Sequence, residues 1–383
     1  MKNLYLFLVV SLLFAGAAVA ATDPVSHAAA LSKSSPMLEM VFVIDTTGSM
    51  GGLIQGAKQK VWSIVNEVMK SPKHPKVKVG LVAYRDRGDV FVTKVLPLTS
   101  DLDKVYTTLM DYSADGGGDE PENVRHALAD GVHRAGWSQR SSRIAQILFL
   151  VGDSPPHNDY QDEPDTTKTA AEAVRTGIIV NTIQCGTTAS TTPIWQAIAR
   201  QGEGQYFAIA QDGGVNAVST PYDTKLSKLG NKIGSTYLAY GGGSGVLGGK
   251  YRADKESRQM AIESKVYAAA PMSAQADRAV NKAINSEAYM GDLLQDIESG
   301  KVKLEAVKQK DLPNDLQKLT PVQQKQAVAK RLTERKNLRA QILQLSKQRD
   351  AYIHSQTGAK SAGFDAAVTK ALTKQLAQKG IKL

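Results

Sequence analysis

Four unbroken apolar runs, separated by amphipathic stretches, constrain the fold of this chain more than any other feature. The runs are residues 40–44, 77–84, 144–151 and 178–184. Unbroken runs rich in β-branched residues are typical of strands that are buried on both faces of a parallel sheet. Helical patterns lie between them, at residues 53–69, 124–135, 167–176 and 194–201. The alternation predicts an α/β domain with a doubly wound, mostly parallel sheet over residues 36–240.

A short charged segment, Arg87-Gly88-Asp89, separates the second apolar run from residues 90–96. Gly and Asp favour tight turns, so this segment predicts a hairpin at the edge of the sheet. The same tripeptide occurs in cell-adhesion ligands, but a charged turn between two strands accounts for it here.

The chain changes character after the predicted α/β domain. Residues 241–249 are rich in glycine and predict a flexible linker. Residues 250–383 are rich in Ala, Gln and Lys, which favours helices. Apolar residues at three- and four-residue steps from Leu338 to Tyr352 predict a helical hairpin or a short coiled coil, although Arg335 and Arg349 interrupt the stripe. We therefore expect a smaller, all-helical C-terminal region.

The first twenty residues have the three parts of a cleaved signal peptide. A positively charged start precedes an apolar stretch at residues 4–14, and Ala18-Val19-Ala20 supplies the small residues of a cleavage site. The apolar stretch is shorter than the roughly 20 residues of a transmembrane helix. We expect a periplasmic or secreted protein with no transmembrane anchor and no nucleic-acid partner.

The basic character of the chain lies in its C-terminal region. Residues 250–383 have a net charge of +11, against +10 for the whole chain. Lysine-rich helices usually present a solvated face. Contact of these helices with anionic surfaces, such as lipid or cell-wall polymer, is the alternative.

Three polar clusters follow the predicted strands and helices. They are Asp45-Thr46-Thr47-Gly48-Ser49, residues 115–122 (DGGGDEPE), and Gly152-Asp153-Ser154. Ligands of open α/β sheets bind at the carboxyl ends of the strands. Because Asp45, Thr47 and Ser49 alternate along one turn, their oxygen atoms can converge. One carboxylate and two hydroxyls suit Mg²⁺, Mn²⁺ or Ca²⁺ better than zinc or copper.

This pattern resembles the metal-ion-dependent adhesion site, D-x-S-x-S, of the von Willebrand factor A family, with Thr47 replacing the first serine. The resemblance covers residues 36–240. It implies that Thr47 and Ser49 contact the metal directly, that Asp45 and Asp153 often act through water, and that a carboxylate of the partner completes the coordination. The family commonly has a threonine where this chain has Asp119, a change that should tighten metal binding and weaken the attraction for an acidic ligand.

The expected metal ligands are Asp45, Thr47, Ser49, Asp119 and Asp153, with Mg²⁺ as the first candidate and Mn²⁺ or Ca²⁺ as alternatives. The expected function is metal-dependent adhesion or assembly outside the cytoplasm, with a protein partner that presents Asp or Glu to the metal and with no catalysis. Two alternatives remain open. One is a scaffold that binds through the basic C-terminal helices, and the other is a serine hydrolase with Ser154 as nucleophile and His157 as base.

Overall fold

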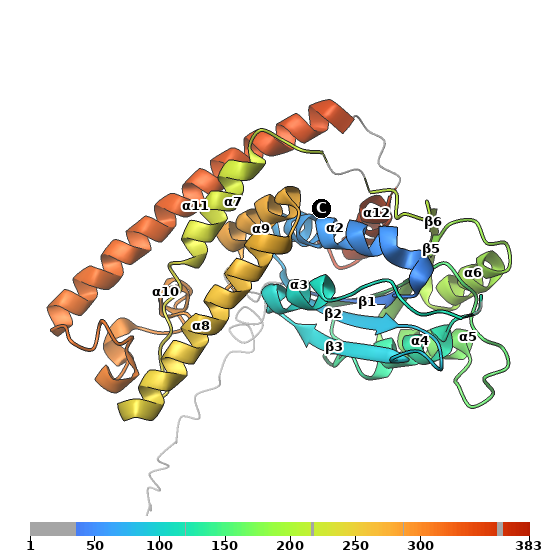
Figure 1. Ribbon diagram of the computed structural model, residues 1–383, viewed down its shortest axis with the longest axis horizontal. Helices are drawn as coiled ribbons and strands as arrows, with labels where there is room; N and C mark the ends of the chain where they lie inside the picture. Colours follow the sequence, from blue (N-terminus) through green and yellow to red (C-terminus); the bar gives the residue numbers. More distant parts are fainter. Residues whose placement is uncertain (1–35, 119, 216–217, 286, 358–362) are drawn as a thin grey trace, which may run out of the picture. The chain divides into compact units, whose positions relative to one another are not determined.

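A six-stranded sheet in the order β3-β2-β1-β4-β5-β6 lies at the centre of the α/β part of the chain (Figure 1). The strands are β1 (Met37–Asp45), β2 (Lys76–Tyr84), β3 (Thr93–Thr99), β4 (Ile144–Gly152), β5 (Ile178–Cys185) and β6 (Glu203–Ile209). All neighbouring strands are parallel except β2 and β3, which form an antiparallel pair. The mostly parallel sheet and its hairpin edge confirm the predicted fold class.

The computed structural model describes residues 36–118, 120–215, 218–285, 287–357 and 363–383. The predicted signal peptide lies outside these residues, and so does Asp119. Residues 36–383 form one compact unit. In the described part of the chain, none of the helices has the length and apolar character that crossing a bilayer requires.

Helices cover both faces of the sheet. They are α2 (Gly51–Met69), which follows the short turn η1 (Gly48–Met50), α3 (Leu102–Met110), α4 (Val124–His133), α5 (Thr166–Thr176), α6 (Thr191–Gln201) and α12 (Phe364–Ala377). Successive side chains of a strand point to opposite faces. Phe42 and Ile44 accordingly share a core with α2, α3 and α12, whereas Val41 and Val43 share one with α4, α5 and α6. Strands β1, β2, β4 and β5 are therefore buried on both sides, as their unbroken apolar sequences predicted.

The C-terminal helix α12 packs against the sheet and is not part of the helical region. Its Phe364 ring lies 5.9 Å from the ring of Phe42 in β1. Asn181 of β5 and Gln375 exchange two buried hydrogen bonds, at 3.1 and 2.7 Å. The helices from α7 to α11 are thus an insertion between β6 and α12, which differs from the expected helical region at 250–383. We refer to residues 36–215 and 363–383 as the sheet domain and to residues 223–357 as the helical insert.

The segment that leads from the sheet domain into the helical insert and the segment that leads back lie side by side. The amide of Phe364 donates to the carbonyl of Gly213, at 2.9 Å. A Cβ atom on Gly363 would lie 2.2 Å from the carbonyl oxygen of Gly214, so only glycine permits this approach. The insert therefore begins and ends at one narrow neck.

The helical insert has cores of its own. Its elements are α7 (Asp223–Gly234), α8 (Gly245–Ala269), α9 (Met272–Ile284), α10 (Leu293–Glu298), η2 (Leu304–Ala306), η3 (Gln309–Asp311) and α11 (Pro321–Thr357). Leu226, Val280 and Ile342 join α7, α9 and α11 in one apolar cluster. A second cluster surrounds Leu294 and Leu316.

Residues 241–249 are ordered by specific contacts and are not the flexible linker that their composition suggested. Gly241 and Gly243 have φ values of +90° and +76°, which residues other than glycine rarely adopt. Their amides both donate to Asp311, at 2.7 Å, and Arg252 donates to both of their carbonyls. Helix α8 then begins at Gly245. These glycines allow the backbone to adopt positive φ values. The amino-acid composition alone cannot distinguish this role from that of a flexible linker.

The two arginines that interrupt the apolar stripe of α11 form buried ion pairs. Arg335 pairs with Asp292, and both side chains are fully buried. Arg349 contacts Asp223 and Asp277, at 2.7 Å each. The stripe thus packs against α7 and α9, with an ion pair wherever an arginine replaces an apolar residue.

Candidate functional site

Asp45 is the last residue of β1, and only one of the two oxygens of its buried carboxylate has hydrogen-bond partners among the described residues. Its side chain is fully buried, and its Oδ1 atom accepts hydrogen bonds from the amide and the hydroxyl of Thr47, at 2.8 and 2.7 Å. Its Oδ2 atom is buried without a hydrogen-bond partner among the described residues. Leaving a buried charged oxygen unpaired is unfavourable. This oxygen therefore marks a place where a cation would be stabilising.

The turn after Asp45 brings Thr47 and Ser49 to the same edge of the sheet. Thr47 is 2% exposed, whereas Ser49 lies on the exposed short turn η1. The amide of Gly48 donates to Gly116, at 3.2 Å, and the amide of Asp115 donates to Thr46, at 3.1 Å. Two of the three predicted loops are thus joined through their backbones.

Asp153 reaches the site from the end of β4. Strands β1 and β4 pair in parallel with Ile44 opposite Val151, so Asp45 lies beside Gly152, and Asp153 follows. A Cβ atom on Gly152 would lie 3.1 Å from the Cβ of Asp45, so the glycine makes room for that side chain. The structure therefore brings together Asp45, Thr47 and Asp153 as the sequence predicted.

Gln211 is a member of the site that the sequence analysis did not identify. Its Nε2 atom donates to Oδ2 of Asp153, at 2.6 Å, and lies 3.4 Å from the carbonyl of Ser49. Gln211 follows β6, whose mixed polar and apolar sequence was not among the predicted strands. The available signal was the polar pair Gln211-Asp212 at the end of that run.

Glu122 is a second residue that the sequence analysis did not assign to the site. It is 3% exposed, and its Oε2 atom has no hydrogen-bond partner within the described residues. A Cβ atom on Gly117 would lie 3.0 Å from Oε1 of Glu122 and 3.2 Å from the Cβ of Thr47, so these groups crowd one small space. The loop at 115–122 therefore contributes a buried carboxylate, while the predicted ligand Asp119 is not described.

Crowding of buried carboxylates changes their protonation. Burial, together with the charge of Asp153, raises the pKa of Asp45 to about 7. Burial, followed by the charges of Asp45 and Asp86, raises the pKa of Glu122 to about 9. In the absence of a cation these groups repel one another, and protons neutralise them near neutral pH. A bound cation would relieve the same repulsion.

The chemistry of these groups fits a hard divalent cation. Their carboxylate and hydroxyl oxygens are the ligands that Mg²⁺, Mn²⁺ and Ca²⁺ prefer. Within the described residues, no three His, Cys, Asp or Glu side chains form a cluster that could hold a metal by themselves. Hydroxyl groups and water would therefore have to supply several ligands, as Mg²⁺ commonly allows.

The Arg87-Gly88-Asp89 segment forms the predicted turn, with its charged groups bound to this chain. Arg87 pairs with Asp162 and Glu163, at 2.8 Å each. Asp89 accepts from the amides of Asp86 and Gly117, both at 3.1 Å. These contacts fold the segment against the loops around the site.

Ser154 and His157 have partners that differ from those of a hydrolase. The Ser154 hydroxyl donates to Asp153, at 3.0 Å. The imidazole of His157 lies 2.8 Å from Asp159 through Nδ1 and 3.2 Å from Asp86 through Nε2. The serine-hydrolase alternative gains no support from these pairings.

Comparisons with known proteins agree with this architecture. The von Willebrand factor A domain family matches residues 39–221, a little under half of the chain. Von Willebrand factor A domain-containing protein 7 of Rattus norvegicus is 42% identical over 96 residues, and that of Homo sapiens is 41% identical over the same length. These matches cover 24% of this chain and 10% of each relative, so the chain spans about a tenth of the length of those relatives.

Solved structures of low sequence identity also match. The conserved hypothetical protein BatB from Bacteroides thetaiotaomicron is 17% identical with a TM-score of 0.34, over 45% of this chain and 90% of that chain. The SpRpn10 VWA domain is 17% identical with a TM-score of 0.33, over 46% and 89%. Von Willebrand factor A domains commonly mediate protein–protein interaction. By the match of the family model, residues 39–221 of this chain are similar to the von Willebrand factor A domain family.

Proposed function

We propose that the sheet domain binds a divalent cation through Asp45, Thr47 and Ser49 and uses it to hold a protein partner. Asp153 and Asp119 would support the cation from the neighbouring loops. Mg²⁺ is the first candidate, with Mn²⁺ and Ca²⁺ as alternatives. The observation that carries the proposal is the fully buried Oδ2 atom of Asp45, which has no partner among the described residues.

The surroundings of Asp45 support this assignment. Glu122 also holds a buried oxygen without a hydrogen-bond partner among the described residues, and Gln211 orients Asp153 at 2.6 Å. When bound, the cation would supply positive charge that can attract an oxygen ligand from outside. We propose that a carboxylate of the partner is that ligand and that binding takes place outside the cytoplasm.

Isothermal titration of the metal-free protein with Mg²⁺, Mn²⁺ and Ca²⁺ tests the proposal. We expect saturable binding at one site, and we expect Asp45→Ala to abolish it. Asp162→Asn is the matched control, because Asp162 is an exposed carboxylate that pairs with Arg87. Circular dichroism of each variant checks that the fold persists. Absence of binding by the folded wild-type protein would contradict the proposal and favour binding through the helical insert.

A further inference from the structure

The segment between α10 and α11 presents a glutamate surrounded by lysines. Lys301, Lys303, Lys308 and Lys310 are all exposed, and so is Glu305 on the short turn η2. Lys301 lies 3.7 Å from Asp296, whereas Glu305 and the other three lysines form no ion pair with the described residues. We call residues 301–310 the basic tip.

The basic tip is held in a fixed conformation. Leu304 and Val307 pack against the apolar cluster around Leu294. Arg252 donates to the carbonyl of Lys310, at 3.1 Å, and Gln324 donates to Gln309, at 2.9 Å. Figure 1 shows this orange segment beside α8 and the start of α11. Its charges are thus displayed on an ordered surface.

The loops around the proposed cation site carry the opposite charge. Asp115, Glu120, Asp159 and Asp212 are exposed on three of these loops, and we call them the acidic rim. Two arginines of this edge are already paired, because Arg87 binds Asp162 and Glu163 and Arg85 lies 3.5 Å from Asp115. A lone acidic ligand would therefore be repelled by the rim before it reached the site.

We propose that the partner of the cation site is a second copy of this chain. The basic tip of one copy would lie on the acidic rim of the next, with Glu305 directed to the cation. This inference rests on the function proposed above. Such a contact joins two different surfaces of the same chain, so it is heterologous and can continue from copy to copy.

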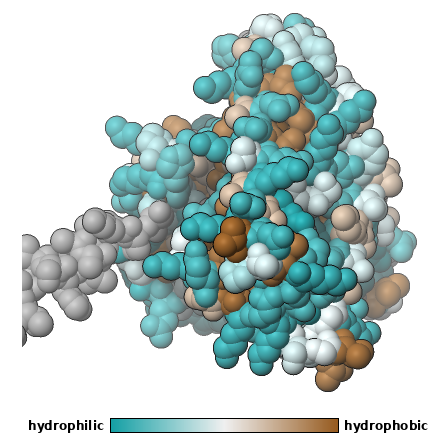
Figure 2. All heavy atoms as spheres, turned by 90° about the vertical axis from the view of Figure 1, so that its left-hand side faces the viewer, coloured by the Kyte–Doolittle hydropathy of each residue, from teal (hydrophilic) through white to brown (hydrophobic). Residues whose placement is uncertain are grey.

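Charge complementarity favours this partner over an anionic lipid surface. The lysines of the basic tip would attract either, but an anionic lipid would repel Glu305 and would leave the acidic rim without a partner. The insert-bearing side of the molecule is mostly hydrophilic in Figure 2, as expected for a contact made by charges.

Sedimentation velocity of the mature protein with Mg²⁺ at low ionic strength tests self-association. We expect the sedimentation coefficient to rise with protein concentration and the rise to disappear at about 0.5 M NaCl, where exposed charges are screened. Reversal of the basic tip (Lys303, Lys308 and Lys310→Glu) or of the acidic rim (Glu120, Asp159 and Asp212→Lys) should each give a monomer. A mixture of these two variants should associate again, because each now complements the other.

The role of Glu305 is tested by Glu305→Gln, with Glu334→Gln as the matched control on the exposed side of α11. We expect Glu305→Gln to weaken association by about tenfold or more, whereas the monomeric variant should still bind Mg²⁺ saturably at one site through Asp45, Thr47 and Ser49. Association that survives both this substitution and metal removal would overturn the assignment of Glu305.

Two further outcomes overturn the self-association itself. One is a wild-type protein that binds the metal yet stays monomeric at about 100 μM, well above the range of specific protein affinities. The other is binding to phosphatidylglycerol vesicles by a monomeric protein, which would assign the lysines to a lipid surface. Failure of Mg²⁺ to bind at all would instead refute the function on which this inference rests.

Discussion

At the scale of single residues, Asp45 combines complete burial with incomplete hydrogen bonding. Thr47 satisfies Oδ1 through two hydrogen bonds, while Oδ2 has no partner among the described residues. The β1 strand and the turn that follows it hold this carboxylate in place through these hydrogen bonds. Its ionisation should therefore destabilise the metal-free protein.

Stability of the metal-free protein should fall as the pH rises from about 4 to 7. The pKa of Asp45 rises from 3.8 to about 7 on folding, so between these values the unfolded chain has released a proton that the folded chain retains. Asp45→Asn removes this effect and should raise the free energy of unfolding by as much as about 4 kcal/mol at pH 8, with little change at pH 4. Urea unfolding in EDTA at both pH values measures this difference. An equal effect at both would show that ionisation of Asp45 is not the cause.

Gln211 should affect metal binding through Asp153. Its amide donates to Oδ2 of Asp153, at 2.6 Å. Removing a group that orients a metal ligand typically weakens binding by about 10- to 100-fold. We expect a loss of this size for Gln211→Ala in Mg²⁺ titration, with partial recovery for Gln211→Asn. An unchanged affinity would mean that Asp153 is oriented by other groups.

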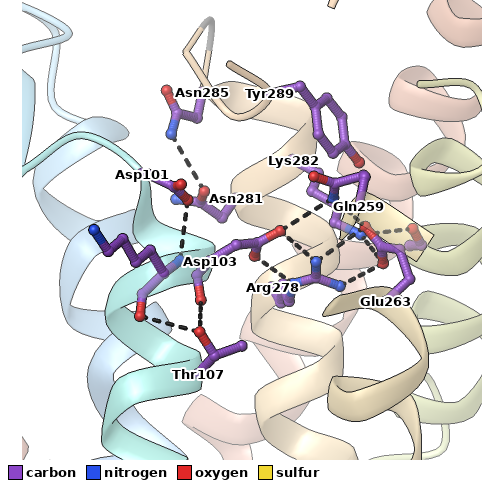
Figure 3. Close-up of polar contacts among 12 residues, drawn as sticks. Asp101, Asp103, Thr107, Gln259, Glu263, Arg278, Asn281, Lys282, Asn285 and Tyr289 are labelled. Carbon is purple, nitrogen blue, oxygen red and sulfur yellow. Dashed lines mark hydrogen bonds and ion pairs between the residues drawn. The ribbon is translucent and has the colours of Figure 1, made fainter. Parts of the chain in front are cut away.

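At the scale of elements, buried ion pairs join the helical insert to the sheet domain (Figure 3). Arg278 of α9 contacts Asp103 of α3, at 2.7 and 2.5 Å, and Glu263 of α8, at 2.6 and 3.0 Å. Lys282 adds a contact to Glu263, at 2.5 Å. Burial alone would raise the pKa of Glu263, but Lys282 and Arg278 lower it to about 2. The network joins two basic side chains to two acidic ones, so its formal charges balance.

Substitution of Arg278 should be strongly destabilising. Arg278→Met leaves Asp103 and Glu263 buried without their main cation, and breaking such a pair typically costs about 3–5 kcal/mol. Lys250→Met is the matched control, because its pair with Asp254 is exposed and should contribute at most about 0.5 kcal/mol. Urea unfolding of both variants gives the comparison. A small effect for Arg278→Met would mean that apolar contacts alone hold this interface.

At the scale of the whole molecule, the helical insert interrupts the sequence of the sheet domain between β6 and α12. Helix α12 then packs against the sheet. The two ends of the insert meet at the neck, where the amide of Phe364 lies 2.9 Å from the carbonyl of Gly213. A short connection could therefore replace the insert without moving α12.

Replacing residues 218–362 with a short Gly/Ser linker should leave a folded sheet domain. Deleting residues 358–383 from the full chain should instead prevent cooperative unfolding, because it uncovers the core around Phe42 and the partners of Asn181. Circular dichroism and thermal unfolding of the two truncated proteins distinguish these expectations. If the second protein folds and the first does not, α12 is not part of the sheet domain.

The sequence alone determined the fold class and most of the proposed site. Continuous apolar runs can be buried only between two layers of helices, and parallel strands place their carboxyl ends at one edge, so Asp45, Thr47 and Asp153 could be grouped from their positions along the chain. Gln211 and Glu122 could not be assigned, because their contribution depends on where their loops fold relative to β1. Metal binding itself, and the roles of Asp45, Thr47, Ser49, Asp119 and Asp153 as ligands, stay predictions.

Only the tertiary structure decided the organisation of the C-terminal half. Helix α12 resembles its neighbours in composition, yet it packs on the sheet because Phe364 and Gln375 match groups of β1 and β5. The glycines at 241–243 are ordered because Asp311, distant in sequence, binds their amides. The arginines of α11 are buried because aspartates of other segments face them. Local patterns report which residues prefer burial or helix, but partners distant in sequence decide where those residues pack.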